Sequence, residues 1–261
     1  MNRHERVAAR FDAAAGSYDA HSPAQRHAAQ RLVEHLVPLG LPPRPRILEI
    51  GCGTGHLTER LVRHFPGATI RATDIAPAMV AACQSRLGAN PHLRFEVMDG
   101  RRPASADFYE RRPARPHAFD LICGNLVAQW FDDLPGACAR LAACLLPGGT
   151  LLLSLPGGET FREWKAAHTR HGFTAGTLPL PTPQACYAAL PPGNNRVDSE
   201  YWIDRPADGL TFLRGLRAIG ADTAAAGHTP LAPAQLRRVL RELGPRPALT
   251  YELIYLCHRK I

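Results

Sequence analysis

Short apolar runs alternate with longer amphipathic stretches through the middle of the 261-residue chain. The apolar runs have the length and the flanking turn residues of buried strands, and the stretches between them have the period of helices with one apolar face. This alternation is typical of a parallel sheet that is covered by helices on both faces. We predict strands at 46–50, 69–73, 93–97, 119–123 and 149–155, and helices at 56–65, 77–87 and 133–145.

Helical patterns dominate on both sides of this alternating core. A first helix is predicted at 5–15. A second is predicted to begin after Ser22 and to continue to Gly40, with Ser22 as the N-cap, Pro23 in the first turn and Gln25 at the capping-box position. Further helices are predicted at 159–171, 207–218 and 232–243, and further strands at 197–203 and 249–257.

The length and the 45% hydrophobic content are sufficient for one large α/β domain over residues 1–261. We divide it into N-terminal helices (1–45), a cofactor-binding core (46–155), a lid or substrate insertion (156–195), and C-terminal strands and helices (196–261). No apolar run approaches the roughly 20 residues of a membrane span, and the charged N-terminus lacks the apolar segment of a signal peptide. We therefore expect a cytoplasmic protein that does not enter a membrane.

The seven cysteines are scattered and mostly lie in apolar runs, without a C-x-x-C pair. This pattern predicts buried free thiols. The twelve histidines show neither H-x-x-x-H nor H-E-x-x-H spacing, so no metal site is expected. The formal charge of +8 suits an acidic partner, which could be a nucleic acid, an acidic protein or an anionic substrate.

A turn of alternating glycines follows the first predicted strand. Residues 49–55 have the pattern E-x-G-x-G-x-G, whereas a dinucleotide fingerprint would need a glycine in place of His56. Such a turn leaves backbone groups exposed for the methionine end of S-adenosylmethionine, which has no phosphate. Glu49 and Asp74, at the ends of two successive strands, supply carboxylates beside a ribose diol and a cationic sulfonium. The pattern therefore predicts an S-adenosylmethionine site.

The order of these motifs resembles the class I S-adenosylmethionine-dependent methyltransferases. The motifs are the glycine turn, Asp74, Asp99-Gly100, the strand that begins at Phe119, Asn125, and the turn Pro147-Gly148-Gly149. The resemblance implies a Rossmann-like, seven-stranded, mostly parallel sheet whose last strand is antiparallel. It also implies that Gly51, Gly53 and Gly55 face the methionine end of the cofactor and that Asp74 faces the ribose. Asp99 is expected to face the adenine amino group, and Ile75 and Met79 the adenine ring. Glu49, Gly100 and Asn125 complete the expected cofactor site.

Three further pieces resemble a narrower family, the malonyl-acyl-carrier-protein O-methyltransferases of biotin synthesis. The first piece is 11–21, which contains Tyr18-Asp19. The second is 125–130, which reads N-L-V-A-Q-W, and the third is 213–221; residues 249–251 add to the resemblance. The resemblance then spans nearly the whole chain. Two segments depart from it: 101–116 is long and basic where the family has a short loop, and 172–195 is unusually rich in proline and alanine.

The narrower resemblance implies a malonyl carboxylate as the methyl acceptor. A carboxylate is ionised at neutral pH, so methyl transfer to it requires alignment and exclusion of water but no general base. An arginine is the natural partner of such a carboxylate. The candidates are Arg162, Arg205, Arg214 and Arg217, of which we favour Arg162. Tyr18 is predicted to close over the cofactor, and Gln129 and Trp130 to contact the substrate.

The implied partner is an acidic acyl carrier protein loaded with malonate, or malonyl-coenzyme A, and the basic loop 101–115 is one candidate docking surface for the carrier. A methyltransferase for a small free acid or a phenol remains an alternative. An RNA methyltransferase is disfavoured because 125–128 is not an N-P-P-Y-type motif. A protein that binds the cofactor without catalysis is a third alternative.

Overall fold

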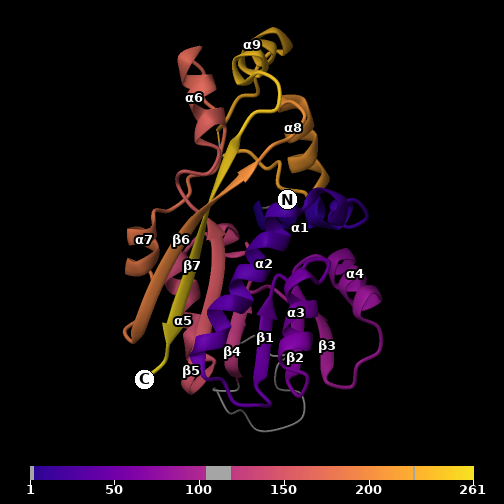
Figure 1. Cartoon of the computed structure of the whole chain (residues 1–261), viewed down its shortest axis with the longest axis vertical. Coiled ribbons are helices and arrows are strands. Elements are labelled where there is room, and N and C mark those ends of the chain that lie inside the picture. The colour runs from indigo at the N-terminus through magenta and orange to yellow at the C-terminus, as the bar shows by residue number, and fades with distance from the viewer. Residues whose placement is uncertain (1–2, 104–118, 226) are drawn as a thin grey trace.

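Seven strands form one sheet in the computed structural model, which describes residues 3–103, 119–225 and 227–261 (Figure 1). They are β1 (Arg46–Ile50), β2 (Thr69–Asp74), β3 (Leu93–Val97), β4 (Phe119–Gly124), β5 (Leu145–Pro156), β6 (Asn194–Asp204) and β7 (Leu249–Arg259). Their order is β3-β2-β1-β4-β5-β7-β6, and β7 runs antiparallel to both of its neighbours while the pairs from β3 to β5 are parallel. The predicted sheet with an antiparallel last strand is confirmed.

Helices cover both faces of this sheet (Figure 1). One face carries α2 (Pro23–Leu36), α3 (His56–His64) and α4 (Pro77–Leu87), and the other carries α5 (Leu134–Ala143) and α7 (Pro183–Ala188). The N-terminal α1 (Arg3–Ala14) lies against α4. Three short 3-10 turns complete this part: η1 (Asp19–His21), η2 (Val37–Leu39) and η4 (Ala128–Trp130). In the described ranges, no helix has the length and apolar character needed to cross a membrane.

Each central strand supplies side chains to two hydrophobic cores, because successive side chains of a strand point to opposite faces. In β1, Ile47 packs with α2 and α3, and Leu48 packs with α5; both are fully buried. In β4, Leu121 and Ile122 divide in the same way. All seven cysteines are buried and unpaired, as predicted.

A cap of three helices lies beyond the carboxyl ends of the parallel strands (Figure 1). The cap consists of α6 (Arg162–Arg170), α8 (Gly209–Ala218) and α9 (Pro233–Leu243), and its apolar centre includes Trp164, Phe212 and Val239. The expected lid segment 156–195 contributes only α6 to it. The same segment also contains α7, a helix that we did not predict in the Pro-rich stretch. α7 forms because Thr182 accepts a hydrogen bond from Ala185 N and Pro183 occupies the first turn.

The start of α2 differs from the predicted capping box. Ser22 precedes the helix, and Pro23 is its first residue, but the Ser22 hydroxyl makes no capping hydrogen bond. It lies instead 2.9 Å from His56 Nε2, at the start of α3. A tertiary contact therefore replaces the expected local one.

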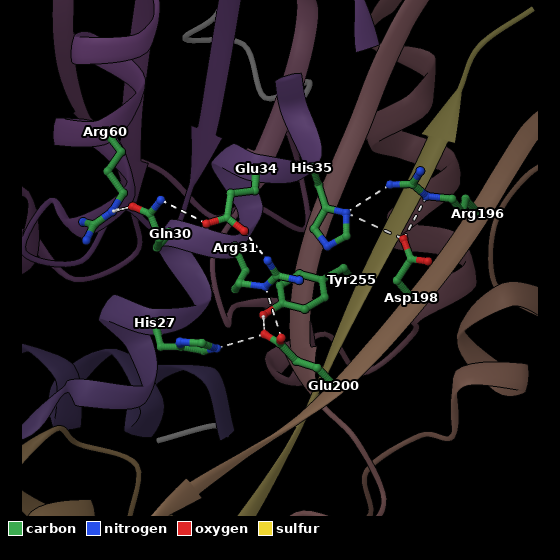
Figure 2. Close-up of polar contacts among 10 residues, drawn as sticks. All are labelled: His27, Gln30, Arg31, Glu34, His35, Arg60, Arg196, Asp198, Glu200 and Tyr255. Atoms are coloured by element: carbon green, nitrogen blue, oxygen red, sulfur yellow. Dashed lines mark hydrogen bonds and ion pairs between the residues drawn. The ribbon is translucent and has the colours of Figure 1, made fainter. Parts of the chain in front are cut away.

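A polar network joins α2 to the outer strands β6 and β7 (Figure 2). Glu200 of β6 accepts hydrogen bonds from the Tyr255 hydroxyl (2.7 Å) and from Arg31 Nε (3.1 Å), and His27 Nε2 lies 3.0 Å from the same carboxylate. A second set of contacts surrounds His35, further along the helix. These bonds attach α2 to β6 and β7, beside the apolar contacts of the same helix.

Replacing Tyr255 with phenylalanine is expected to lower the free energy of unfolding by about 1–2 kcal/mol, because the change leaves Glu200 with one donor fewer in a half-buried site. Urea unfolding measures the effect. Tyr187→Phe is the matched control, because the Tyr187 side chain is 54% exposed. Equal stability of the two variants would show that the network does not stabilise the fold.

Candidate functional site

A cavity of about 460 Å³ extends from the carboxyl ends of β1, β2 and β4 to the cap. This is the edge at which open α/β sheets bind their ligands. We call the part at the sheet the glycine-turn half and the part under the cap the cap half. Eight of the predicted cofactor residues line the cavity: Gly51, Gly53, Asp74, Ile75, Met79, Asp99, Gly100 and Asn125. Tyr18, Gln129 and Trp130 line it as well.

The glycine turn follows β1 in a conformation that favours glycine. Gly51, Gly53 and Gly55 have φ angles of 68°, 53° and 97°, a region in which other residues are strained. At Gly51 an added Cβ would also lie 2.7 Å from a methyl group of Val127. The sequence thus lets the backbone of β1 approach the segment after β4 closely, with no side chain between the turn and the cavity.

Asp74 holds this turn in place from the end of β2. Its carboxylate accepts hydrogen bonds from Gly53 N and Ala76 N, both at 2.9 Å. Burial raises the pKa of Asp74, while the backbone N–H groups oppose that shift by favouring the ionised form. A carboxylate at the wall of the cavity with a lone pair left on each oxygen can still accept hydrogen bonds from a diol.

The wall beyond Asp74 is apolar and ends at a second carboxylate. Met79 is almost completely buried beneath the cavity. Asp99 binds Arg101 through Nε (2.9 Å) and Nη2 (2.6 Å). Although burial acts in the opposite direction, the Arg101 hydrogen bonds and charge lower the pKa of Asp99 overall. At Gly100 an added Cβ would lie 2.1 Å from Ile50, so only glycine lets this loop pass over β1.

The segment after β4 is fixed by side-chain amides. Asn125 donates from Nδ2 to the Gln25 carbonyl (2.9 Å) and accepts from the Ser154 hydroxyl (3.1 Å). Gln129 donates to the Leu126 carbonyl (2.6 Å), and its buried Oε1 has no hydrogen-bond partner among the described residues. This unpaired acceptor on the cavity wall is available to an N–H or O–H group of a ligand.

Residues 3–21, the N-terminal strap, close the cavity on another side. Tyr18 lines the cavity, and the adjacent Asp19 binds the Thr54 hydroxyl (2.5 Å) of the glycine turn as well as Arg86 of α4. Ser17 donates to the carbonyl of Ala218 at the end of α8 (2.8 Å). The strap therefore connects the glycine turn to the cap.

The cap half is lined largely by aromatic and aliphatic side chains that we did not predict. The ring of Phe161 lies 4.7 Å from that of Tyr251 and 4.9 Å from that of Phe212, and Trp164 packs on the same cluster. His168 also faces the cavity from α6, and burial lowers its pKa. Trp164 and His168 share one face of α6, which the sequence pattern could have indicated. Phe161 precedes the helix, and its contacts with Phe212 and Tyr251 are long-range.

Glu49 and Gly55 were predicted in the cofactor site but do not line the cavity. Glu49 points to the opposite side of the glycine turn and is fully buried. Neither carboxylate oxygen has a hydrogen-bond partner among the described residues. Burial, with smaller contributions from Cys83 and Asp74 and against the opposing effect of the nearby Thr58, raises the pKa of Glu49 to about 8. Gly55 faces Cys83 instead of the cavity.

None of the four arginines predicted to bind the substrate carboxylate lines the cavity. Arg162 begins α6 on its outer side, where it binds Glu163 (3.1 Å) and lies 5.2 Å from the centre of the Tyr201 ring. Arg205, Arg214 and Arg217 are exposed. The structure therefore does not bring these four arginines to the cavity, because helix periodicity turns the apolar neighbours of Arg162, Arg214 and Arg217 inward. Most of the basic loop 101–115 lies outside the described residues.

The glycine-turn half fits S-adenosylmethionine. The turn leaves no side chain where a zwitterion would meet backbone groups, Asp74 faces the space for a diol, and Ile75 and Met79 form an apolar wall for a purine. Within 3–103, 119–225 and 227–261, no three His, Cys, Asp or Glu side chains are grouped to hold a metal ion.

Comparison with known sequences gives consistent matches. The methyltransferase domain family matches residues 48–151. A biotin biosynthesis bifunctional protein from Bordetella avium is 45% identical over 250 residues, which are 95% of the chain but 51% of that protein, so the chain spans about half its length. A malonyl-[acyl-carrier protein] O-methyltransferase from Magnetococcus marinus is 38% identical over 259 residues, covering 97% of the chain and 92% of the relative.

Solved structures share the fold at low sequence identity. The YcgJ protein from Bacillus subtilis has a TM-score of 0.57 at 14% identity, covering 90% of the chain and 98% of that structure. Phosphoethanolamine N-methyltransferase 2 from Haemonchus contortus, solved with S-adenosyl-L-methionine, also has a TM-score of 0.57, at 16% identity, covering 95% of the chain and 57% of that structure.

Proposed function

The chain belongs to the malonyl-[acyl-carrier protein] O-methyltransferase family, and we propose that it methylates the free carboxylate of a malonyl thioester on an acyl carrier protein, with S-adenosylmethionine as the methyl donor. Its product is the methyl ester from which biotin synthesis proceeds. The ester removes a charge that an elongating acyl chain would otherwise have to bury.

The observation that carries this proposal is the continuity of the cavity from the glycine turn to the apolar cap half. A thioester on a long, mostly uncharged arm can lie along the cap half with its carboxylate directed toward the sheet. A small free acid would leave most of this half unfilled.

The residues of the glycine-turn half would hold the cofactor. Gly51 and Gly53 would receive the methionine end, Asp74 the ribose diol, and Ile75 and Met79 the adenine. When bound, S-adenosylmethionine supplies an electrophilic methyl group and leaves as a neutral thioether. The enzyme then has to align the acceptor oxygen and exclude water. No proton is transferred, so the site needs no general base.

Tyr18 is the residue that we propose to position the acceptor carboxylate. Burial, with the charges of Asp74 and Asp19, raises the pKa of Tyr18, so its hydroxyl keeps its proton and can donate a hydrogen bond. A neutral donor orients the carboxylate without neutralising it, which preserves its nucleophilicity. This assigns to a tyrosine the role that the sequence suggested for an arginine.

Tyr18→Phe is expected to lower kcat/KM for the malonyl substrate by about 10–100-fold, because it removes one hydrogen bond to a charged group in a buried site. The dissociation constant of S-adenosylmethionine should change by less than about threefold if the hydroxyl serves the acceptor. Arg162→Ala is the control and should leave kcat/KM within about twofold. A large loss in Arg162→Ala with none in Tyr18→Phe would restore the arginine hypothesis.

Intact-mass analysis of the carrier protein tests the proposed function. Malonyl-carrier protein incubated with enzyme and S-adenosylmethionine should gain the mass of one methyl group. Acetyl-carrier protein, which lacks the free carboxylate, should gain none. Methylation of a free acid or a phenol in the absence of any malonyl-thioester product would contradict the proposal.

A further inference from the structure

Five exposed arginines lie on α8 and α9, two of the cap helices that line the cavity. Leu213 and Leu216 of α8 and Leu236 of α9 face the cavity. The arginines occupy other positions of the same helices: Arg214 and Arg217 on α8, and Arg237, Arg238 and Arg241 on α9. Within the described part of the chain, none of the five forms an ion pair with a carboxylate.

The outer stripe of α8 also carries an exposed apolar side chain. Leu210 is 42% exposed and precedes Arg214 by four residues and Arg217 by seven, so all three lie on one side of the helix. An apolar residue bordered by cations is a common composition for the interface with a charged protein.

The region around these two helices carries a net positive charge. Residues 205–246 contain seven arginines and three carboxylates, which gives +4, half of the chain's formal +8. Many arginines elsewhere are neutralised by neighbouring carboxylates, among them Arg31, Arg86 and Arg140. The uncompensated charge of the cap therefore creates a field that attracts an acidic partner.

We propose that the outer stripe of α8, formed by Leu210, Arg214 and Arg217, is the docking surface for the acidic carrier domain, an inference that rests on the proposed function. The α9 arginines add to the attraction. A carrier bound there places its acyl arm beside helices that line the cavity. This assigns Arg214 and Arg217 to the partner protein, where the sequence had suggested the substrate carboxylate.

The double variant Arg214→Glu/Arg217→Glu tests the surface. We expect its KM for malonyl-carrier protein to rise by about tenfold or more, and the dissociation constant of the carrier, measured by titration calorimetry, to rise in parallel, because like charges then oppose the encounter. With malonyl-pantetheine, which has the arm but neither the carrier nor a phosphate, kcat/KM should stay within about twofold. The variant should melt at the wild-type temperature, since both side chains are exposed.

Arg63→Glu/Arg94→Glu is the matched control, because it makes the same change of charge at exposed positions of α3 and β3, away from the cap. The proposed docking surface would be overturned if the dissociation constant of the carrier were unchanged in the α8 variant, or if it rose equally in the control. The proposal would also be overturned if the α8 variant lost its affinity for an RNA oligonucleotide while its affinity for the carrier stayed unchanged. If the wild type methylates neither malonyl substrate, the proposed function fails, whereas calorimetry still reports on docking.

Discussion

Replacing Asp74 with alanine is expected to raise the dissociation constant of S-adenosylmethionine by at least about 100-fold. The carboxylate accepts two backbone hydrogen bonds that hold the glycine turn, and its remaining lone pairs face the space proposed for the ribose. Hydrogen bonds to a charged group contribute about 1.5–3 kcal/mol each, so losing the ribose contacts and loosening the turn together account for a change of this size. Titration calorimetry measures it directly.

Asp120→Ala is the control for Asp74→Ala. Asp120 also accepts a backbone hydrogen bond, from Arg46 N at 2.8 Å, but at the start of β1 and therefore at the opposite edge of the sheet. Both variants should lose some stability, and only Asp74→Ala should lose cofactor affinity. Affinity within about threefold of the wild type in Asp74→Ala would show that another group binds the ribose.

Glu49→Gln is expected to stabilise the cofactor-free protein at alkaline pH, by about 3–5 kcal/mol at and above pH 8. Burial raises the pKa of Glu49 from 4.5 to about 8, so the folded state binds a proton that the unfolded state has already lost. The contribution of Glu49 to the free energy of unfolding is fully present below about pH 4.5. Between about pH 4.5 and pH 8 it falls by about 1.4 kcal/mol per pH unit. Glutamine does not titrate and so removes the loss.

Urea unfolding of both proteins between about pH 5 and pH 9 measures this effect. The two stabilities should nearly coincide at the acidic end and diverge steadily until about pH 8. Glu252→Gln provides the comparison: Glu252 is also buried but accepts a hydrogen bond from Glu159 N at 2.8 Å, so its replacement should destabilise the fold. A pH-independent difference between Glu49→Gln and the wild type would mean that the carboxylate is ionised in the fold.

The sheet and the glycine-turn half of the cavity could be predicted from sequence because their signals are local. The apolar run of β1 and the glycines after it lie within ten residues, and the φ angles of Gly51, Gly53 and Gly55 explain why glycine is needed there. Asp74 could be placed because parallel strands end at the same edge of a sheet. Glu49 was misplaced because the alternation of side chains along β1 turns it toward the α2 and α3 face, beneath the turn.

The cap half could not be predicted because its signals are long-range. Phe161, Phe212 and Tyr251 come from three separate elements and meet only when β7 carries the end of the chain back beside β5. Arginines are abundant in this chain, and charge alone does not distinguish one that faces a cavity from one that faces solvent. The packing of the apolar neighbours on α6 and α8 made that distinction.

The position of the transferred methyl group tests the central claim most directly. Malonyl-carrier protein is incubated with the enzyme and S-adenosylmethionine that carries a deuterated methyl group, and the product is then hydrolysed with alkali. Transfer to the carboxylate oxygen predicts labelled methanol and unlabelled malonate. Label retained on the acid, as deuterated methylmalonate, would place the methyl group on carbon and contradict the account.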